Sequence, residues 1–97
     1  MPMSGDLLFD PNKQQINIQK HDDIDFYEAN SALNDPYALY ERDFGDYNGE
    51  ERYFTIGMSD KGRLIIVNWC IFDDKFRIFS SRLCTPSQRK NYEKRRR

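Results

Sequence analysis

The sequence predicts an α+β fold in which an antiparallel β-meander packs with two N-terminal helices and one C-terminal helix. Three observations support this prediction. First, apolar residues recur at helical spacing before residue 36. Second, they alternate with a period of two from there to residue 83. The third is a proline-containing cap just after residue 84, which starts a last helix. A chain of 97 residues suffices for one compact core, so we expect residues 1–97 to form a single domain.

The first third of the chain predicts a short strand and two helices. Residues 7–9 form a short apolar, extended segment. Asp10 followed by Pro11 provides an N-cap and a first-turn proline, so a helix is expected over residues 11–20. Asp25 caps a second helix, which ends at an Asn-Asp-Pro sequence because the residue before a proline avoids the helical region. The apolar face of this second helix consists of Phe26, Ala29 and Leu33.

Four strands and a final helix are expected in the remainder. The segment 63–72 is apolar on both faces, which is typical of a central strand and requires helices or a partner protein over the sheet. Thr85 and Gln88 enclose Pro86 in a capping box that starts a basic C-terminal helix. The other expected strands cover residues 37–42, 52–58 and 75–83.

Charge is divided between the two halves of the chain, although the formal net charge is only −1. Residues 1–60 contain thirteen acidic and four basic side chains, a net charge of −9, whereas residues 61–97 contain three acidic and eleven basic ones, a net charge of +8. Basic charge gathered at one end is expected of a phosphate-binding face. It is equally compatible with two halves that attract each other, or with a basic tail that aids solubility.

Composition limits the classes of protein further. The longest apolar run has four residues and the N-terminus lacks the regions of a signal peptide, so we expect a soluble, cytoplasmic protein without membrane contact. Cys70, Cys84 and the single histidine are too few and too widely spaced for a zinc site, and no metal is expected. The cysteines are expected to be packed thiols, since a disulfide would need their strands to pair in register.

Short segments spread over residues 7–93 resemble, in order and spacing, those of the BrnT family of type II toxins. The most specific is Arg-Ile-Phe-Ser-Ser-Arg at residues 77–82, followed by Thr85 and Tyr92, which is similar to the Arg-Ile-Ile-Ser-Ala-Arg segment and closing helix of that family. The other matching segments are Phe9 to Lys13, Asn17 to His21, Phe26 to Ala29, Asp35-Pro36, Gly49 to Arg52 and Thr55 to Gly57.

The resemblance implies a small ribonuclease with a fold similar to RelE-type toxins. Such a toxin cleaves messenger RNA without a cofactor, slows translation, and is neutralised by a BrnA-type antitoxin that also binds operator DNA. The chain departs from the family pattern in two places. Asp22 stands where the family usually has glycine after Lys-His, with one residue more before Phe26, and Gln88 stands where the family often has Glu.

Metal-free RNA cleavage needs a base for the 2′-OH proton, an acid for the leaving 5′-oxygen and cationic donors for the charged phosphorane. Histidine exchanges protons near neutral pH, and His21 is the only one, although it and Lys20 could simply cap a helix C-terminus. Arg82 and Ser80 lie at the end of an otherwise apolar strand face. Glu51 could be a general base or form an edge-strand salt bridge. The candidate catalytic residues are therefore His21, Arg82, Glu51 and Ser80.

Phosphate contacts are expected from cations on the strands and the last helix. Strict alternation places Arg82 and Ser80 on one face and Arg77 on the other, so these arginines line one groove only if a bulge intervenes. Arg52 and Arg77 could instead pair with nearby glutamates, and Tyr92 could pack in the core rather than stack on a base. The candidate RNA-binding residues are Lys20, Arg52, Arg77, Arg89 and Tyr92.

A second hypothesis comes from a different class of protein. In a non-catalytic module that binds protein or nucleic acid, Lys20, His21 and Arg82 would be interface or capping residues. A degenerate toxin, altered at the turn after His21, would likewise bind its antitoxin but cleave poorly. The sequence does not decide between these functions, nor does it indicate a cleavage-site preference.

Overall fold

A computed structural model describes residues 7–45 and 47–96 of the chain. The order of elements along the chain is the predicted one, and the helices begin where their caps indicate. The elements are β1 (Leu7–Leu8), α1 (Pro11–Lys20), α2 (Phe26–Leu33), β2 (Leu39–Asp43), β3 (Arg52–Met58), β4 (Leu64–Phe72), β5 (Lys75–Leu83) and α3 (Pro86–Arg96).

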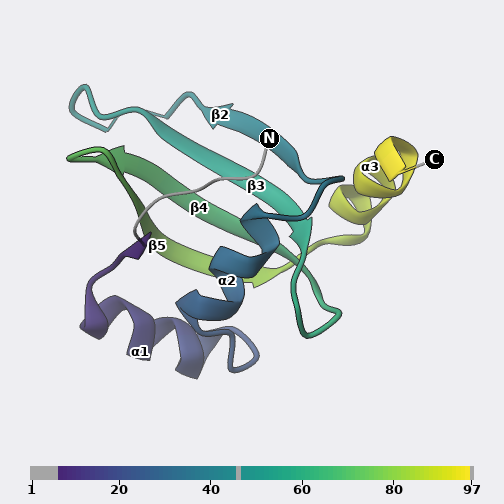
Figure 1. Cartoon of the computed structure of the whole chain (residues 1–97), viewed down its shortest axis with the longest axis horizontal. Helices are drawn as coiled ribbons and strands as arrows, with labels where there is room; N and C mark the ends of the chain where they lie inside the picture. Colours follow the sequence, from purple (N-terminus) through teal and green to yellow (C-terminus); the bar gives the residue numbers. More distant parts are fainter. Residues whose placement is uncertain (1–6, 46, 97) are drawn as a thin grey trace.

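The strands form one five-stranded sheet in the order β1-β5-β4-β3-β2 (Figure 1). Strands β2 to β5 are the expected antiparallel meander. The sheet as a whole is mixed rather than an antiparallel meander alone, because the short first strand β1 joins it by pairing in parallel with β5, Leu7 opposite Phe76. The reason is topological: α1 and α2 carry the chain from β1 to the far edge, where β2 runs opposite to β1, and three further reversals through β3 and β4 bring β5 beside β1 in the same direction.

Helices α1 and α2 cover one side of the sheet (Figure 1). Phe26, Ala29 and Leu33 of α2 are buried against Ile65 and Val67 of β4, as the helical spacing predicted. Gly57 of β3 permits this packing, because a Cβ there would lie 2.4 Å from the Ala32 carbonyl oxygen of α2. The apolar central strand is therefore covered on this side by helices of the same chain.

Helix α3 packs on the opposite side of the sheet, where Tyr92 joins Ile56, Leu64 and Ile66 in a second apolar cluster. The Tyr92 hydroxyl donates a hydrogen bond of 2.6 Å to the carboxylate of Asp35, so the residue is held at both its ring and its hydroxyl. The predicted capping box is confirmed: the Gln88 amide donates to the Thr85 hydroxyl, and the Gln88 side chain accepts from the Thr85 amide. α3 lies at one end of the sheet (Figure 1), and no other helix of the described residues packs on this face.

A β-bulge interrupts β5. Asn68 of β4 pairs with Ser80, whereas the next residue, Trp69, pairs with Ile78, which leaves Phe79 as the additional residue. The additional residue shifts the alternation of side chains by one position, so residues of β5 on either side of the bulge that are an odd number apart in sequence share one face of the sheet.

The bulge corrects one prediction about the strand faces. Regular alternation placed Arg77 and Arg82 on opposite faces, and this is wrong. Arg77 lies opposite Cys70 and Arg82 lies opposite Ile66, and these two residues of β4 are four apart and so share a face.

No helix in the described part of the chain is both long and apolar enough to cross a membrane. Both cysteines are free, with Cys70 buried in β4 and Cys84 half-buried. The backbone of Cys84 bonds to Leu64, six residues along β4 from Cys70 and thus about 20 Å away, which is too far for a disulfide.

Candidate functional site

Three arginines of two strands lie on the open face of the sheet, together with Ser80. Arg52 of β3 and Arg77 of β5 both have Cys70 as their partner on β4, so they form a row across three strands. Arg82 lies further along β5, towards α3. We call Arg52, Arg77, Ser80 and Arg82 the arginine face. The predicted candidates from the strands are thus brought together, apart from Glu51.

Arg52 is held in a fixed orientation. Its guanidinium carbon lies 4.3 Å from the ring centroid of Tyr47 and 4.4 Å from that of Phe79, which places it between two aromatic rings. Its Nε donates a hydrogen bond of 2.8 Å to Glu50, the kind of pairing that the sequence left open. Among the described residues its two terminal nitrogens have no recorded hydrogen bond, and they remain as paired donors suited to a phosphate.

Glu50 contacts this row through Arg52. The hydrogen bond from Arg52 lowers the pKa of Glu50 below its ordinary value, and the charge of Arg77 acts in the same direction. Arg77 also lies over the ring of Phe72, 5.6 Å from its centroid. Burial raises the pKa of the Cys70 thiol, so the residue between the two arginines stays neutral.

Ser80 and Arg82 form their hydrogen bonds with uncharged groups. The Asn68 side-chain amide donates a 2.7 Å hydrogen bond to the Ser80 hydroxyl oxygen. Arg82 donates to the Leu83 carbonyl and, at 3.5 Å, to Gln88 of α3. No carboxylate in the described part of the chain forms an ion pair with Arg82. Its charge is therefore not neutralised by a partner, unlike that of Arg52.

A pocket of about 260 Å³ lies between α1 and the bulge of β5. It contains three of the predicted residues, His21, Lys20 and Ser80, and Ser80 also belongs to the arginine face. Lys13 is a further cation there, 6.0 Å from the ring centroid of Phe79. We call this the α1 pocket; its lining residues are Lys13, Ile16, Asn17, Lys20, His21, Phe79 and Ser80.

The turn after α1 determines where His21 lies. The Asp23 amide bonds to the Ile18 carbonyl across the helix end, as in a Schellman motif. Asp22 occupies the left-handed position of that motif with a φ of 55°, and Asp23 follows with 57°. Asp22 is where the related family has glycine, the residue that this conformation favours, and aspartate is among the few others that tolerate it.

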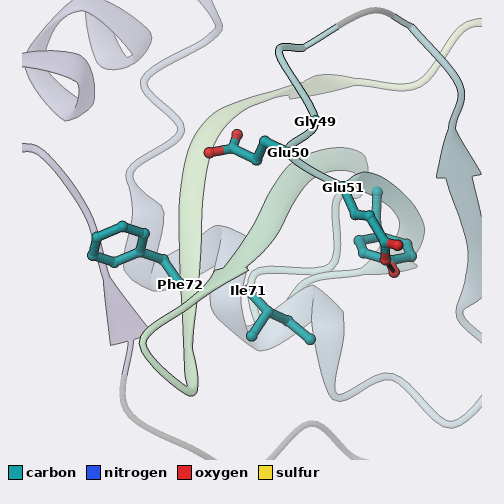
Figure 2. A pocket seen from close by; sticks show the side chains of 6 residues that line it. Gly49, Glu50, Glu51, Ile71 and Phe72 are labelled. Atoms are coloured by element: carbon teal, nitrogen blue, oxygen red, sulfur yellow. Dashed lines mark hydrogen bonds between the residues drawn. The ribbon is translucent and has the colours of Figure 1, made fainter.

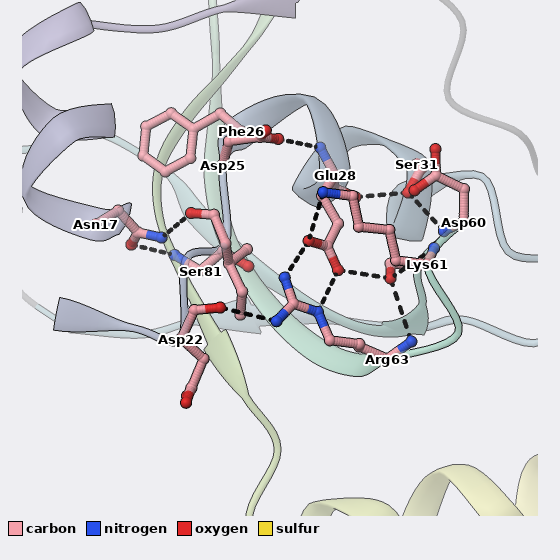
Figure 3. A network of polar contacts seen from close by, with 12 residues as sticks. Asn17, Asp22, Asp25, Phe26, Glu28, Ser31, Asp60, Lys61, Arg63 and Ser81 are labelled. Atoms are coloured by element: carbon pink, nitrogen blue, oxygen red, sulfur yellow. Dashed lines mark hydrogen bonds and ion pairs between the residues drawn. The ribbon is translucent and has the colours of Figure 1, made fainter. Parts of the chain in front are cut away.

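Polar contacts hold this turn against the rest of the fold (Figure 3). Arg63, at the start of β4, donates 2.8 Å hydrogen bonds to the Asp22 carbonyl and to the Glu28 carboxylate of α2. Asn17, which is buried, donates to the Ile24 carbonyl and accepts from the Ser81 amide of β5. Figure 3 shows the two sets of contacts on either side of the turn. The altered turn is therefore an ordered part of the structure.

Glu51 is not part of the arginine face. It accepts a 2.7 Å hydrogen bond from the Tyr53 hydroxyl and lies 3.6 Å from Arg42, which is the edge salt bridge that the sequence allowed. The hydrogen bond to Glu51 raises the pKa of Tyr53. Figure 2 shows a second hollow at this end of the sheet, in which the carboxylates of Glu50 and Glu51 point in different directions. Glu51 thus lies away from Ser80 and His21.

The two candidates on α3 have different surroundings. Tyr92 is only 2% exposed and belongs to the apolar cluster, so its ring is not available to stack on a base. Arg89 is exposed one turn earlier on the same helix. The basic C-terminal residues beyond Arg95 include Arg97, which lies outside the described residues.

Sequence reasoning did not select Lys13, Phe79 or Asn68. Lys13 has a signal in the sequence, since it lies seven residues before Lys20 and thus on the same side of the helix. Phe79 has none, because a bulge residue cannot be told from a regular strand residue before the pairing is known. Asn68 is the one polar residue in an apolar strand, and that contrast could have identified it.

Comparisons with known proteins agree with this architecture. Residues 9–88 match the family described as "Ribonuclease toxin, BrnT, of type II toxin-antitoxin system". Among solved structures, the ribonuclease toxin BrnT of Brucella abortus is similar with a TM-score of 0.62 and 22% identity, covering 84% of this chain and 99% of that one. No curated protein matches the chain. Because the match spans most of the sequence, the chain belongs to the BrnT family of ribonuclease toxins of type II toxin–antitoxin systems.

Proposed function

We propose that the chain is an endoribonuclease that cuts messenger RNA without a metal ion and so inhibits translation. The observation that carries the proposal is the continuity of the arginine face with the α1 pocket through Ser80, which joins three strand arginines to Lys13, Lys20 and His21. In the reaction, the 2′-oxygen attacks the adjacent phosphorus, the bond to the 5′-oxygen breaks, and a 2′,3′-cyclic phosphate forms.

Each part of the site has a role in this reaction. His21 exchanges a proton with one of the two reacting oxygens, and Ser80 donates a hydrogen bond to a phosphate oxygen. Arg82 neutralises the charge that grows on the phosphorane, because no ion-pair partner competes for it among the described residues. Arg52 and Arg77 bind the phosphates on either side, with Arg89 adding charge along the RNA path.

We further propose that the toxin works in the cytoplasm and has a RelE-like fold. A BrnA-type antitoxin, which itself binds the operator DNA, covers the arginine face and keeps the toxin inactive. Binding of DNA by the toxin itself is not part of the proposal, since the antitoxin supplies it.

Expression from a tight inducible promoter tests the proposal. Wild type is expected to stop growth and to cut RNA, with purified protein remaining active in excess EDTA. His21→Ala and Arg82→Ala are each expected to lower the cleavage rate by at least about 100-fold, as loss of an acid–base group or of a charge-stabilising donor does. Arg42→Ala is the matched control, since it removes a cation whose partner is Glu51, outside the site.

RNA that stays intact in the presence of soluble, folded wild-type protein would reject the ribonuclease assignment. The chain would then be a binding module, and growth would continue normally. Cleavage that His21→Ala and Arg82→Ala leave unchanged would show instead that the catalytic residues lie elsewhere on the molecule.

A further inference from the structure

The α1 pocket contains apolar side chains that are not buried in either apolar cluster of the protein. Ile16 of α1 is 49% exposed, and Phe79, the additional residue of the bulge, is half-buried. Both line the pocket, so two apolar side chains that are at least partly exposed stand there beside cationic and polar groups. A flat aromatic ligand with a polar edge is complementary to such a hollow.

Phe79 is available to such a ligand although a guanidinium lies against it. Arg52 is 4.4 Å from the ring centroid but is not among the residues that line the pocket. The guanidinium and the pocket therefore contact different parts of the ring. With about 260 Å³, the pocket is smaller than the sites that hold drug-sized molecules, and it suits a single nucleobase.

The polar groups of the pocket are almost all donors. Lys13 and Lys20 carry ammonium groups, which donate and cannot accept. The Ser80 oxygen accepts from Asn68, and its one hydrogen is the donor that the proposed reaction gives to a phosphate oxygen, so the two lysines are the donors that face the base. Asn17 is buried and already donates to Ile24 and accepts from Ser81, so it is held at the base of the pocket and is not the group that reads a base. A base edge that carries acceptors therefore fits this pocket better than one that carries an amino group.

We propose that the α1 pocket binds a nucleobase adjacent to the scissile phosphate and selects the keto bases guanine and uracil over adenine and cytosine. The inference rests on the proposed ribonuclease function and adds to it the recognition of the substrate. Guanine presents O6 and N7 as neighbouring acceptors and uracil its two carbonyl oxygens, whereas adenine and cytosine place a donating amino group, which lysines repel, beside their acceptors. Ser80 connects the pocket to the arginine face, so the phosphate of the bound nucleotide lies beside the row of arginines.

Titration with nucleoside 5′-monophosphates, followed by amide NMR, tests this pocket without any cleavage. GMP and UMP are expected to shift the signals of Lys13, His21, Phe79 and Ser80 and to bind several-fold more tightly than AMP and CMP. Ribose 5-phosphate, which lacks a base, is expected to bind most weakly. Ile16→Ser and Phe79→Ala should weaken GMP binding by about tenfold, the order of a lost stacking contact, whereas Phe79→Tyr keeps the ring and should bind as wild type.

Ile71→Ser is the matched control, because Ile71 is a similarly exposed isoleucine (56%) far along the sheet and should leave GMP binding unchanged. Ile16 lies on the helix surface, so its substitution remains informative even if Phe79→Ala unfolds the protein. Equal binding of ribose 5-phosphate and GMP, equal binding of AMP and GMP, or no binding at all would each overturn the inference. If the protein cuts RNA but does not bind GMP, the ribonuclease proposal stands and the base-binding proposal is rejected. If it binds GMP but does not cut RNA, the base-binding proposal stands and the ribonuclease proposal is rejected.

Discussion

At the scale of single residues, the pair formed by Glu28 and Arg63 is the most consequential charged contact. The Glu28 side chain is fully buried, and it accepts hydrogen bonds from Arg63 and from the Ser59 hydroxyl. The hydrogen bond from Arg63 lowers the pKa of Glu28 below its ordinary 4.5, although burial acts in the opposite direction. Arg63 also holds the Asp22 carbonyl, so it connects α2 to the turn that carries His21.

Arg63→Met is expected to lower the free energy of unfolding by about 2–3 kcal/mol, because it leaves a buried carboxylate without its cation. The value is at the lower end for broken buried pairs since Arg63 itself is partly exposed. Urea denaturation measures it. Lys61→Met is the control: its ammonium lies 4.0 Å from Glu28 and is mostly exposed, so a change of no more than about 0.5 kcal/mol is expected.

The same pair predicts a dependence on pH. A carboxylate whose pKa is lowered by folding stabilises the protein above its unfolded pKa, and this stabilisation is lost as the pH falls through the lower folded value. In Arg63→Met, burial without the guanidinium raises the pKa of Glu28, so protonation relieves a buried charge. The difference in unfolding free energy between wild type and Arg63→Met should therefore shrink as the pH falls below about 5. A difference that stays constant from pH 7 to pH 3 would contradict this account.

At the scale of elements, α1 is positioned by polar contacts more than by apolar packing. Its Ile16 is exposed, and its buried residue is Asn17, whose side chain joins the turn at Ile24 to β5 at Ser81. These two bonds determine where Lys20 and His21 stand relative to Ser80. The bulge at Phe79 complements them, since it turns Ser80 towards the pocket and keeps the arginines of β5 on one face.

Asn17→Ala is expected to destabilise the protein by about 2–4 kcal/mol, because it leaves a buried amide hydrogen and a buried carbonyl without partners. RNA cleavage should fall by a larger factor than the loss of folded protein explains, since α1 is no longer held to β5. Thermal or urea unfolding and the cleavage rate per folded molecule measure the two effects. Asn12→Ala on the exposed side of α1 should change neither, and a cleavage rate per folded molecule equal to wild type would argue against a positioning role for Asn17.

At the scale of the whole molecule, the fold brings cations from both halves of the sequence together around the bulge of β5. Lys13, Lys20 and Arg52 come from the acidic half, and they lie beside Arg77 and Arg82 from the basic half. The acidic residues with recorded contacts to this face are few, and Glu50 is held by Arg52. The negative net charge of residues 1–60 therefore does not remove the local positive charge that the proposed RNA binding requires.

RNA binding should depend strongly on salt. If Lys20, Arg52, Arg77 and Arg82 each neutralise one phosphate of single-stranded RNA, the plot of log K against log salt concentration should have a slope of about −3. Arg82→Ala should make the slope less steep by about 0.7, and Arg42→Ala should leave it unchanged. Fluorescence anisotropy with a short RNA and the His21→Ala variant, which prevents cleavage, measures the slope. A slope near zero would show that the arginine face does not bind phosphate.

The chemistry of neighbouring residues was sufficient to predict the order of helices and strands in this protein. The Asp-Pro cap, the Asp25 cap and the Thr85–Gln88 capping box act over three or four residues, so the starts of the helices could be read from the sequence alone. The apolar pattern of β4 likewise predicted a central strand. The order of short motifs identified the family, because those motifs depend only on position along the chain.

The arrangement of the site was decided only by the tertiary structure. Whether Arg77 and Arg82 share a face depends on how β5 pairs with β4, and no local signal marks Phe79 as a bulge. The parallel pairing of β1, the burial of Tyr92 and the separation of Glu51 from Ser80 also follow from contacts between residues far apart in sequence. Side-chain types predict what chemistry a residue can perform, but long-range pairing determines which of them meet, and for this protein that pairing assembles the arginine face beside the α1 pocket.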